Sequence, residues 1–156
     1  MKKNLTLTGM MGVGKSTIGK ALSKRLSKEF VDIDKVIEKK LNLTVQKIFE
    51  QKGEYFFRKL EEKVTLEEIK KDNKIISLGG GAFMNSKIRK FVILHTKSFW
   101  LDVNTNILTK RLQNSKKRPL LVGDDIKFTL EKIYNERKST YSLANFKIDC
   151  SNLATD

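Results

Sequence analysis

The sequence predicts an α/β fold of three layers, in which helices cover both faces of a parallel sheet of about five strands. Two observations support this prediction. Short apolar segments with strand-like patterning alternate along the chain with segments whose apolar residues recur at helical spacing. A glycine-rich stretch at residues 9–16 joins the first strand to the first helix. Since parallel strands need crossover connections, this alternation is typical of a parallel sheet in a single domain.

The glycine-rich stretch at residues 9–16 fits the pattern of a P-loop, a glycine and four free residues followed by Gly-Lys-Ser. An alternating strand at 4–8 precedes it, and a helical pattern follows. The glycines let backbone N–H groups point inward at phosphate, and the new helix adds its free N–H groups and positive dipole end. Lys15 can then reach the β- and γ-phosphates while the Ser16 hydroxyl holds Mg²⁺. We therefore expect the chain to bind a nucleoside triphosphate.

Residues 30–34 predict a second buried strand, which carries Asp32 and Asp34 toward its carboxyl end. If the strand continues to residue 34, both side chains leave it on the same side. Carboxylates beside a P-loop can hold Mg²⁺ or its waters, or accept a hydrogen bond from a substrate hydroxyl. The alternative is that Asp34 only caps a helix that begins at Lys35. The presence of two aspartates favours the functional interpretation.

Residues 44–52 predict a short helix that ends at Gly53, and residues 54–71 predict a long charged helix. Arg58 lies in this second helix beside Phe57. An arginine among aromatic residues can grip a small carboxylate or phosphate with two parallel hydrogen bonds. It can equally be a solvated side chain that only packs its stem against the surface. Periodicity alone does not separate these two interpretations.

A buried strand at residues 74–78 runs into Gly79, Gly80 and Gly81. Three glycines at the end of a strand permit close approach of the backbone to a ligand. A plain flexible turn is the simpler interpretation of the glycines alone. The later segments predict, in order, a helix near 86–91, a strand at 99–103, helices at 105–112 and 124–141, and a strand at 146–150.

Residues 115–123 hold three successive cations and the only proline of the chain. This stretch interrupts the helical pattern, and we interpret it as a basic loop that closes over phosphates. A solvated run of charges is the alternative. The formal net charge of +14 points either to nucleic acid or to a solvated surface with anionic substrates. Because lysines are scattered among acids and no aromatic-basic platform is evident, we expect anionic small molecules and no nucleic acid.

The single cysteine, Cys150, cannot form an internal disulfide, so a reducing cytoplasm is the expected location. No apolar run approaches the ~20 residues of a membrane span, and the basic start of the chain lacks the apolar segment of a signal peptide. We therefore expect no membrane partner. We also expect the chain to be a monomer.

Taken in order along the chain, these motifs resemble those of the shikimate kinase family. The resemblance extends from the P-loop to about residue 144 and depends on the combination of motifs, because a P-loop alone is shared by many unrelated proteins. The matching stretches are residues 9–17, Asp32-Ile33-Asp34 with Ile37-Glu38, Ile48-Phe49 with Gly53-Glu54, Phe57-Arg58 with Glu61-Glu62, residues 78–81, Arg118-Pro119-Leu120-Leu121, and Arg137 with Tyr141.

The resemblance implies a fold like that of the nucleoside monophosphate kinases and ATP-dependent phosphorylation of the 3-hydroxyl of shikimate, on the route to chorismate and aromatic amino acids. It implies one domain over residues 1–156, with a substrate-binding helical region at about 34–60 and a lid at about 113–125. Family members usually continue into a last helix that helps to wall the adenine. Here only residues 151–156 follow the last strand, so we expect that helix to be missing.

The resemblance also implies a role for individual residues. Asp34, Lys15 and Arg118 would be catalytic, and Glu61 would orient Arg58. Ser16 and Asp32 would hold Mg²⁺, the only cofactor expected beside the co-substrate ATP. The nucleotide would contact Met11, Gly12, Val13, Gly14, Lys15, Ser16, Thr17, Arg111 and Arg118. Shikimate would contact Asp34, Phe49, Phe57, Arg58, Gly79, Gly80, Gly81 and Arg137.

Two other functions are compatible with a P-loop. Another small-molecule kinase, for gluconate or a nucleotide, would keep the loop but place different anion clamps, and the pairing of Phe57-Arg58 with Arg137 argues against it. A P-loop ATPase that binds nucleic acid would hydrolyse ATP in response to DNA or RNA, with an affinity that falls steeply with salt.

Overall fold

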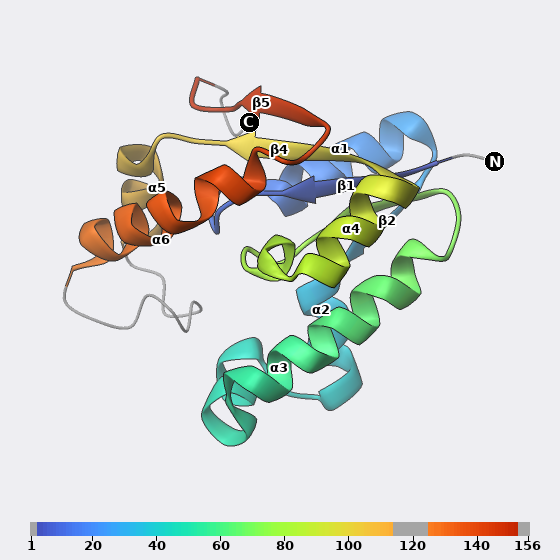
Figure 1. The fold of residues 1–156 in the computed structure, drawn as a ribbon, viewed down its shortest axis with the longest axis horizontal. Coiled ribbons are helices and arrows are strands. Elements are labelled where there is room, and N and C mark those ends of the chain that lie inside the picture. The colour runs from blue at the N-terminus through green and yellow to red at the C-terminus, as the bar shows by residue number, and fades with distance from the viewer. Residues whose placement is uncertain (1–2, 114–124, 153–156) are drawn as a thin grey trace.

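Helices cover both faces of a five-stranded parallel sheet in the computed structural model, which describes residues 3–113 and 125–152 (Figure 1). The strands are β1 Asn4–Thr8, β2 Glu29–Asp32, β3 Lys74–Ser77, β4 Thr96–Asp102 and β5 Phe146–Asp149. The helices are α1 Lys15–Leu26, α2 Ile33–Leu41, α3 Val45–Ile69, the 3₁₀ helix η1 Ala82–Met84, α4 Ser86–His95, α5 Thr105–Leu112 and α6 Ile126–Tyr141.

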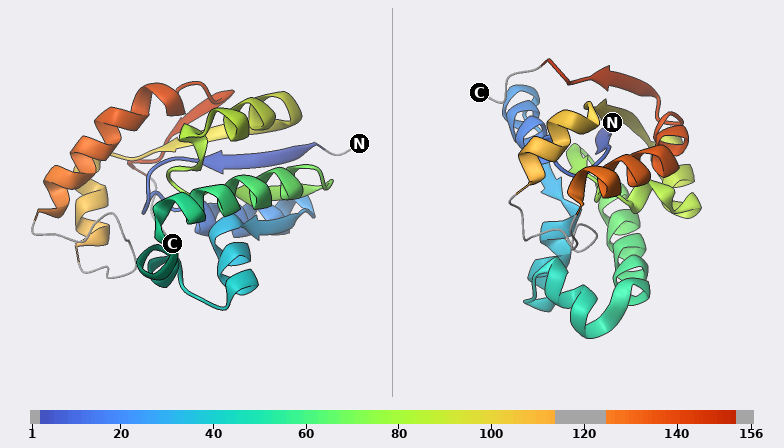
Figure 2. Two further views of the ribbon diagram at one scale, coloured as in Figure 1. Left: turned by 60° about the horizontal axis from the view of Figure 1, so that its bottom comes forward. Right: turned by 90° about the vertical axis from the view of Figure 1, so that its left-hand side faces the viewer.

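The strand order is β2-β3-β1-β4-β5, and every neighbouring pair is parallel. This arrangement confirms the predicted fold class. Helix α1 lies on one face of the sheet, whereas α4 and the second half of α3 lie on the other (Figure 2). All four residues of β3 are buried, as expected for a strand covered on both faces. The carboxyl ends of β1, β2 and β3 therefore meet at one edge, where ligands bind in open parallel sheets.

The buried side chain of Asn4 fixes the position of α3 relative to the sheet. Its amide nitrogen donates to the carbonyls of Ile69 (2.9 Å) and Lys71 (2.5 Å), and its oxygen accepts from the Lys74 amide (2.8 Å). One side chain thus joins β1 to the end of α3 and the start of β3. Because α3 carries Arg58, this junction also helps to set the distance between Arg58 and the P-loop.

The strand predicted at residues 30–34 is shorter than expected, because β2 ends at Asp32 and α2 begins at Ile33. The Asp32 carboxylate accepts a hydrogen bond from the Lys35 amide (3.4 Å), so Asp32 and not Asp34 is the N-cap of α2. Asp34 lies in the first helical turn. The strand does not reach residue 34, so the condition under which both carboxylates would leave it on the same side is not met.

Other predicted boundaries differ at the ends of elements, where local patterns are weakest. The helix predicted near 86–91 continues to His95, and the strand predicted at 99–103 begins at Thr96. The predicted stop at Gly53 is confirmed inside α3, where its φ of 83° and ψ of 166° break the helical geometry. A φ in this range favours glycine, and a Cβ at this position would meet no atom within 4 Å, so conformation rather than space requires the glycine.

The predicted lid at about 113–125 lies almost wholly outside the described residues, and Arg118 lies outside them too. Within the described parts of the chain, no helix has the length and apolar character needed to cross a membrane.

Candidate active site

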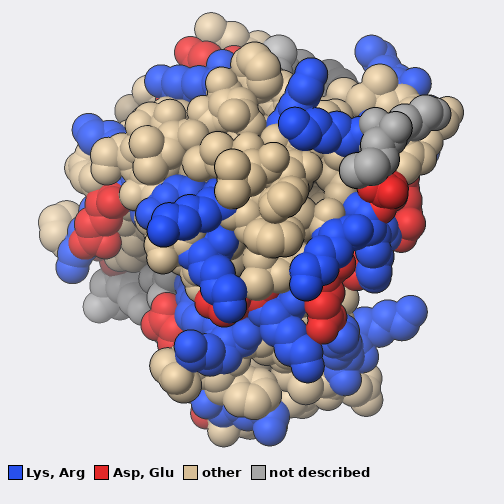
Figure 3. Space-filling model, turned by 45° about the vertical axis from the view of Figure 1, so that its right-hand side comes forward, with Lys and Arg blue, Asp and Glu red and all other residues tan. Residues whose placement is uncertain are grey.

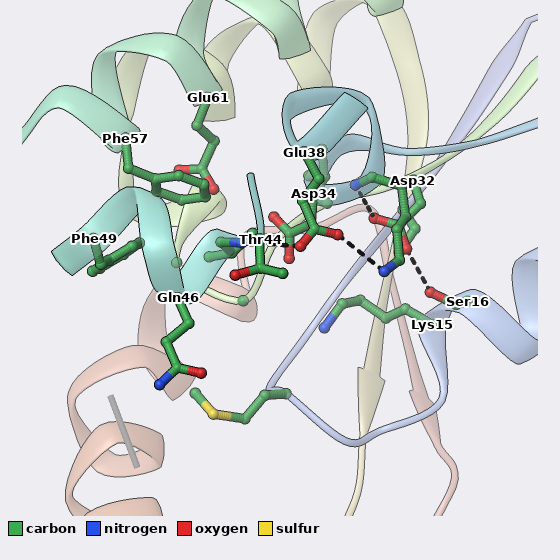
Figure 4. A pocket seen from close by; sticks show the side chains of 18 of the residues that line it. Lys15, Ser16, Asp32, Asp34, Glu38, Thr44, Gln46, Phe49, Phe57 and Glu61 are labelled. Atoms are coloured by element: carbon green, nitrogen blue, oxygen red, sulfur yellow. Dashed lines mark hydrogen bonds and ion pairs between the residues drawn. The ribbon is translucent and has the colours of Figure 1, made fainter. Parts of the chain in front are cut away.

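A cavity of about 970 Å³ opens at the carboxyl edge of the sheet, between the P-loop, α2, α3 and the glycine run that follows β3 (Figure 4). It gathers most of the residues predicted from the sequence. Those that line it are Met11, Gly12, Gly14, Lys15, Ser16, Thr17, Asp32, Asp34, Phe49, Phe57, Arg58, Gly79, Gly80, Gly81, Arg111 and Arg137. Val13 is not in the lining, because its side chain is buried in the core.

The P-loop forms the nucleotide end of the cavity. Gly9, Gly12 and Gly14 all have positive φ values (143°, 81° and 99°), which only glycine adopts readily, and Gly14 is the N-cap of α1. The Lys15 ammonium donates to the carbonyls of Gly9 (2.7 Å) and Met10 (2.9 Å). These bonds hold the cation over the loop, where it adds to the positive end of the α1 dipole. The end of the cavity is thus suited to phosphate.

Arg111 reaches the same loop from α5. Its Nη1 donates to the carbonyl of Gly12 (3.0 Å), so a second cation borders the P-loop. The side chain was predicted to lie near the adenine. The structure places it against the loop and in the lining of the cavity.

Ser16 and Asp32 meet beside the loop. The Ser16 hydroxyl donates to Asp32 Oδ2 (2.8 Å), and Figure 4 shows the pair next to Lys15. In the described part of the chain, no three His, Cys, Asp or Glu side chains form a cluster that could hold a metal ion. A hydroxyl and one carboxylate are nevertheless the kind of partial oxygen site that Mg²⁺ uses when substrate phosphates and water complete its shell.

Arg58 lies at the opposite end of the cavity, in the wall formed by α3. Its Nη1 donates to Glu61 Oε1 (2.9 Å), its Nε lies 3.4 Å from Glu54 Oε1, and its guanidinium carbon is 5.4 Å from the centroid of the Phe57 ring. The side chain is only 28% exposed. These contacts fix the planar group against the pocket, so it is not a side chain extended into solvent.

The three glycines after β3 lie against four charged side chains of the pocket. A Cβ at Gly81 would be 2.6 Å from Arg58 Nη2, and a Cβ at Gly80 would be 3.4 Å from Arg137 Nη1. At Gly79 it would lie 2.8 Å from Glu61 Oε2 and 3.0 Å from an Asp34 carboxylate oxygen. The close contacts explain the glycines at residues 79 and 81, because side chains there would displace charged groups of the pocket.

Arg137 approaches the glycine run from α6. Its Nη1 is buried and has no hydrogen-bond partner among the described residues. Tyr141, one turn later, is also buried and donates its hydroxyl to the carbonyl of Gly80 (2.5 Å). A buried guanidinium nitrogen without a partner costs free energy unless an acceptor completes it, so this end of the pocket is suited to an anion.

The apolar part of the pocket wall comes from two aromatic rings of α3. Phe49 and Phe57 lie on opposite sides of the break at Gly53, and their ring centroids are 4.9 Å apart. The break lets one helix present both rings to the same cavity (Figure 4).

Residues 42–47 also line the cavity, inside the substrate-binding region that the resemblance implied at about 34–60, although none of them was named as a site residue. They form the connection from α2 to α3 and the first turn of α3, and the Glu38 carboxylate accepts from the Val45 amide (2.9 Å) to hold this connection.

The positive charge of the chain is spread over the surface. On the face in Figure 3, lysine and arginine side chains are interspersed with acidic ones. Ion pairs such as Lys35–Glu38 (3.0 Å) and Lys40–Glu67 (3.8 Å) belong to this mixed surface. The arrangement agrees with the expectation of a largely solvated charge.

Comparisons with known proteins point to one family. The family model described as shikimate kinase matches residues 11–156. A shikimate kinase of Sulfurihydrogenibium sp. (strain YO3AOP1) is 43% identical over 147 residues, which cover 94% of this chain and 87% of that protein. A shikimate kinase of Bacillus licheniformis is 38% identical over 156 residues, which cover 99% of this chain and 88% of that protein.

A solved structure leads to the same conclusion. The shikimate kinase from Acinetobacter baumannii in complex with shikimate is 31% identical and has a TM-score of 0.95, covering 99% of this chain and 87% of that one. Family match, sequence identity and fold all extend over nearly the whole chain. The chain belongs to the shikimate kinase family.

Proposed function

We propose that this chain transfers the γ-phosphoryl group of ATP to the 3-hydroxyl of shikimate, giving shikimate 3-phosphate on the route to chorismate. The observation that carries the proposal is a single cavity whose lining includes the P-loop, Arg58 and Arg137. A carboxylate on a small ring can reach Arg58 and Arg137 while a hydroxyl of the ring faces the P-loop. A phosphoryl donor and a carboxylate-bearing acceptor thus fit one pocket.

The nucleotide end would hold ATP through main-chain N–H groups of residues 11–17, Lys15 and Arg111. Val13 would contribute its amide, since its side chain is buried. Ser16 and Asp32 would hold Mg²⁺, Ser16 directly and Asp32 by ordering the water shell, and their 2.8 Å contact supports this pairing. When bound, the ion would offset charge on the β- and γ-phosphates. Arg118 would enter with the lid and add positive charge at the transferred group.

The acceptor end would orient shikimate by its carboxylate and its ring. Arg58 and Arg137 would bind the carboxylate, and Phe49 and Phe57 would pack against the apolar part of the ring. Asp34 lies beside Gly79, between the acceptor wall and the P-loop. From there it would accept a hydrogen bond from the attacking hydroxyl and take its proton.

Catalysis would then depend on position and charge more than on covalent chemistry. Phosphoryl transfer needs the attacking oxygen in line with the leaving group, and two anchor points on the acceptor supply that alignment. Closure of the lid at about 113–125 would exclude water, which would otherwise compete as the acceptor. The single-domain organisation, the cytoplasmic location and the monomeric state remain predictions.

The first test is whether the chain releases ADP in response to shikimate. A coupled assay should show rapid ADP release only when shikimate, ATP and Mg²⁺ are all present. Gluconate, nucleoside monophosphates and RNA serve as alternative acceptors or activators in parallel reactions. Equal ADP release with any of these, or with no acceptor, would contradict the proposed function.

The second test removes the carboxylate of Asp34. Asp34→Asn keeps the shape of the side chain but cannot take a proton, so we expect kcat to fall by roughly 10²–10⁴ while ATP affinity changes little. Asp72→Asn makes the same chemical change at an exposed position and should leave both constants unaltered. If Asp34→Asn retains activity within a few-fold of the parent, Asp34 does not act on the hydroxyl.

The third test concerns the carboxylate clamp. Arg58→Lys keeps the charge but loses the planar fork, so apparent shikimate affinity should fall by about ten- to a hundredfold, from charge-assisted hydrogen bonds of ~1.5–3 kcal/mol. ATP affinity should change little. Arg137→Lys should behave alike, and the double variant should be less than additive if both side chains bind one carboxylate.

The matched control for the clamp is Arg25→Lys, at an exposed position near the end of α1. It should leave shikimate and ATP titrations unchanged. A defect of Arg58→Lys that is confined to ATP would remove Arg58 from the acceptor site.

A further inference from the structure

The carboxyl group of Glu61 has one satisfied oxygen and one unsatisfied oxygen inside the acceptor end of the cavity. The residue is only 1% exposed. Its Oε1 accepts from Arg58 Nη1 (2.9 Å), whereas its Oε2 is buried with no hydrogen-bond partner among the described residues. Oε2 lies next to Gly79, on the side where Asp34 also approaches. A buried carboxylate with a bare oxygen is costly, and protonation of that oxygen removes the cost.

Charged groups face Glu61 from three helices. Arg58 of its own helix and Arg137 of α6 favour the carboxylate, and Asp34 of α2 disfavours it. Burial is the largest effect, and it raises the pKa of Glu61 to about 7 in spite of the two arginines. The carboxyl group is therefore close to the point at which a small change in nearby charge alters its protonation.

The other elements packed on α3 bring charges that are engaged elsewhere. Lys87 of α4 lies 3.3 Å from Glu62, and Arg89 donates to the carbonyl of Phe83 (2.9 Å). Lys74 of β3 lies near Glu29 and Glu68 (2.9 and 3.3 Å), and η1 carries no ionisable side chain. The charges that act on the pKa of Glu61 are thus those of Arg58, Arg137 and Asp34.

An acceptor carboxylate that binds Arg58 would raise the pKa of Glu61. It competes with Glu61 for the guanidinium, and it brings a further negative charge to the same wall. We propose that Glu61 takes up a proton when the acceptor carboxylate binds to Arg58, so that acceptor affinity is linked to pH through this residue. The inference rests on the proposed function, because it requires an acceptor with a carboxylate at Arg58. In this role Glu61 is a positioning residue that acts through Arg58.

The direction of the pH dependence follows from linkage. Below about pH 7 Glu61 is already largely protonated in the free protein, so acceptor affinity is insensitive to pH. Above pH 7, Glu61 is increasingly ionised in the protein without acceptor. It must then take up a proton from solvent when the acceptor binds. Acceptor affinity should then weaken by up to about tenfold per pH unit until the bound form also ionises.

The experiment measures proton uptake directly. Shikimate is titrated into the protein by calorimetry at pH 8, in buffers that differ in ionisation enthalpy. The dependence of the binding heat on the buffer gives the number of protons taken up, and we expect roughly one-half to one. Heat that does not depend on the buffer would overturn the inference while leaving the proposed function intact. No binding of shikimate in any buffer would overturn both.

Glu61→Gln identifies the group that takes up the proton. The amide keeps an oxygen for Arg58 but cannot titrate, so the variant should bind shikimate without proton uptake and with a flat pH profile. Glu62→Gln, at the next position of the same helix, should keep the proton uptake of the parent chain. Uptake that persists in Glu61→Gln would assign the proton to another group and overturn the inference.

A spectroscopic measurement covers the case in which Glu61→Gln does not fold. The infrared difference spectrum of the unaltered protein, recorded on addition of shikimate at pH 8, should gain a band in the region of protonated carboxyl groups. The absence of such a band would overturn the inference without recourse to a variant.

Discussion

Close approach of side chains to the backbone at residues 79–81 is the constraint on which the rest of the pocket depends. Glu61 and Asp34 come near Gly79, and Arg58 comes near Gly81, at distances that a Cβ would prevent. These side chains come from α2 and α3, and the contacts of Asn4 hold the end of α3 to β1 and β3. The glycine run thus lets separate helices present charged groups to one small volume at the end of β3, next to the P-loop.

The charges in that volume are balanced in a way that suits an anionic acceptor. Two guanidiniums face two carboxyl groups, and burial keeps one of these, Glu61, near its protonation point with a pKa of about 7. Arg137 has a buried nitrogen without a partner in the described part of the chain. An entering carboxylate can satisfy that nitrogen and share Arg58 with Glu61. Acceptor binding and proton binding are therefore expected to act on the same group of side chains.

The sequence predicted the P-loop and the order of elements well, because a P-loop is a contiguous motif and sheet topology follows from alternation. It could not decide the role of Arg58, because the contacts that fix it involve Glu54, Glu61 and the backbone at Gly81. Strand periodicity misplaced Asp34, since the strand ends at the Asp32 cap. Residues 42–47 were not named as site residues, because the connection and first turn of α3 that they form carry no motif. Contacts between segments distant in the sequence account for most of what the patterns left open.

The most direct test of the role of the glycine run is shikimate affinity in Gly81→Ala. The φ of Gly81 is −93° and its ψ is −7°, a conformation that alanine can adopt, as at the third residue of a type I turn, so the added methyl group acts mainly through its contact 2.6 Å from Arg58. If the account is right, shikimate affinity falls by about tenfold or more through loss of charge-assisted hydrogen bonds, while affinity for an ATP analogue and the melting temperature change little. Shikimate affinity equal to that of the parent chain would contradict it.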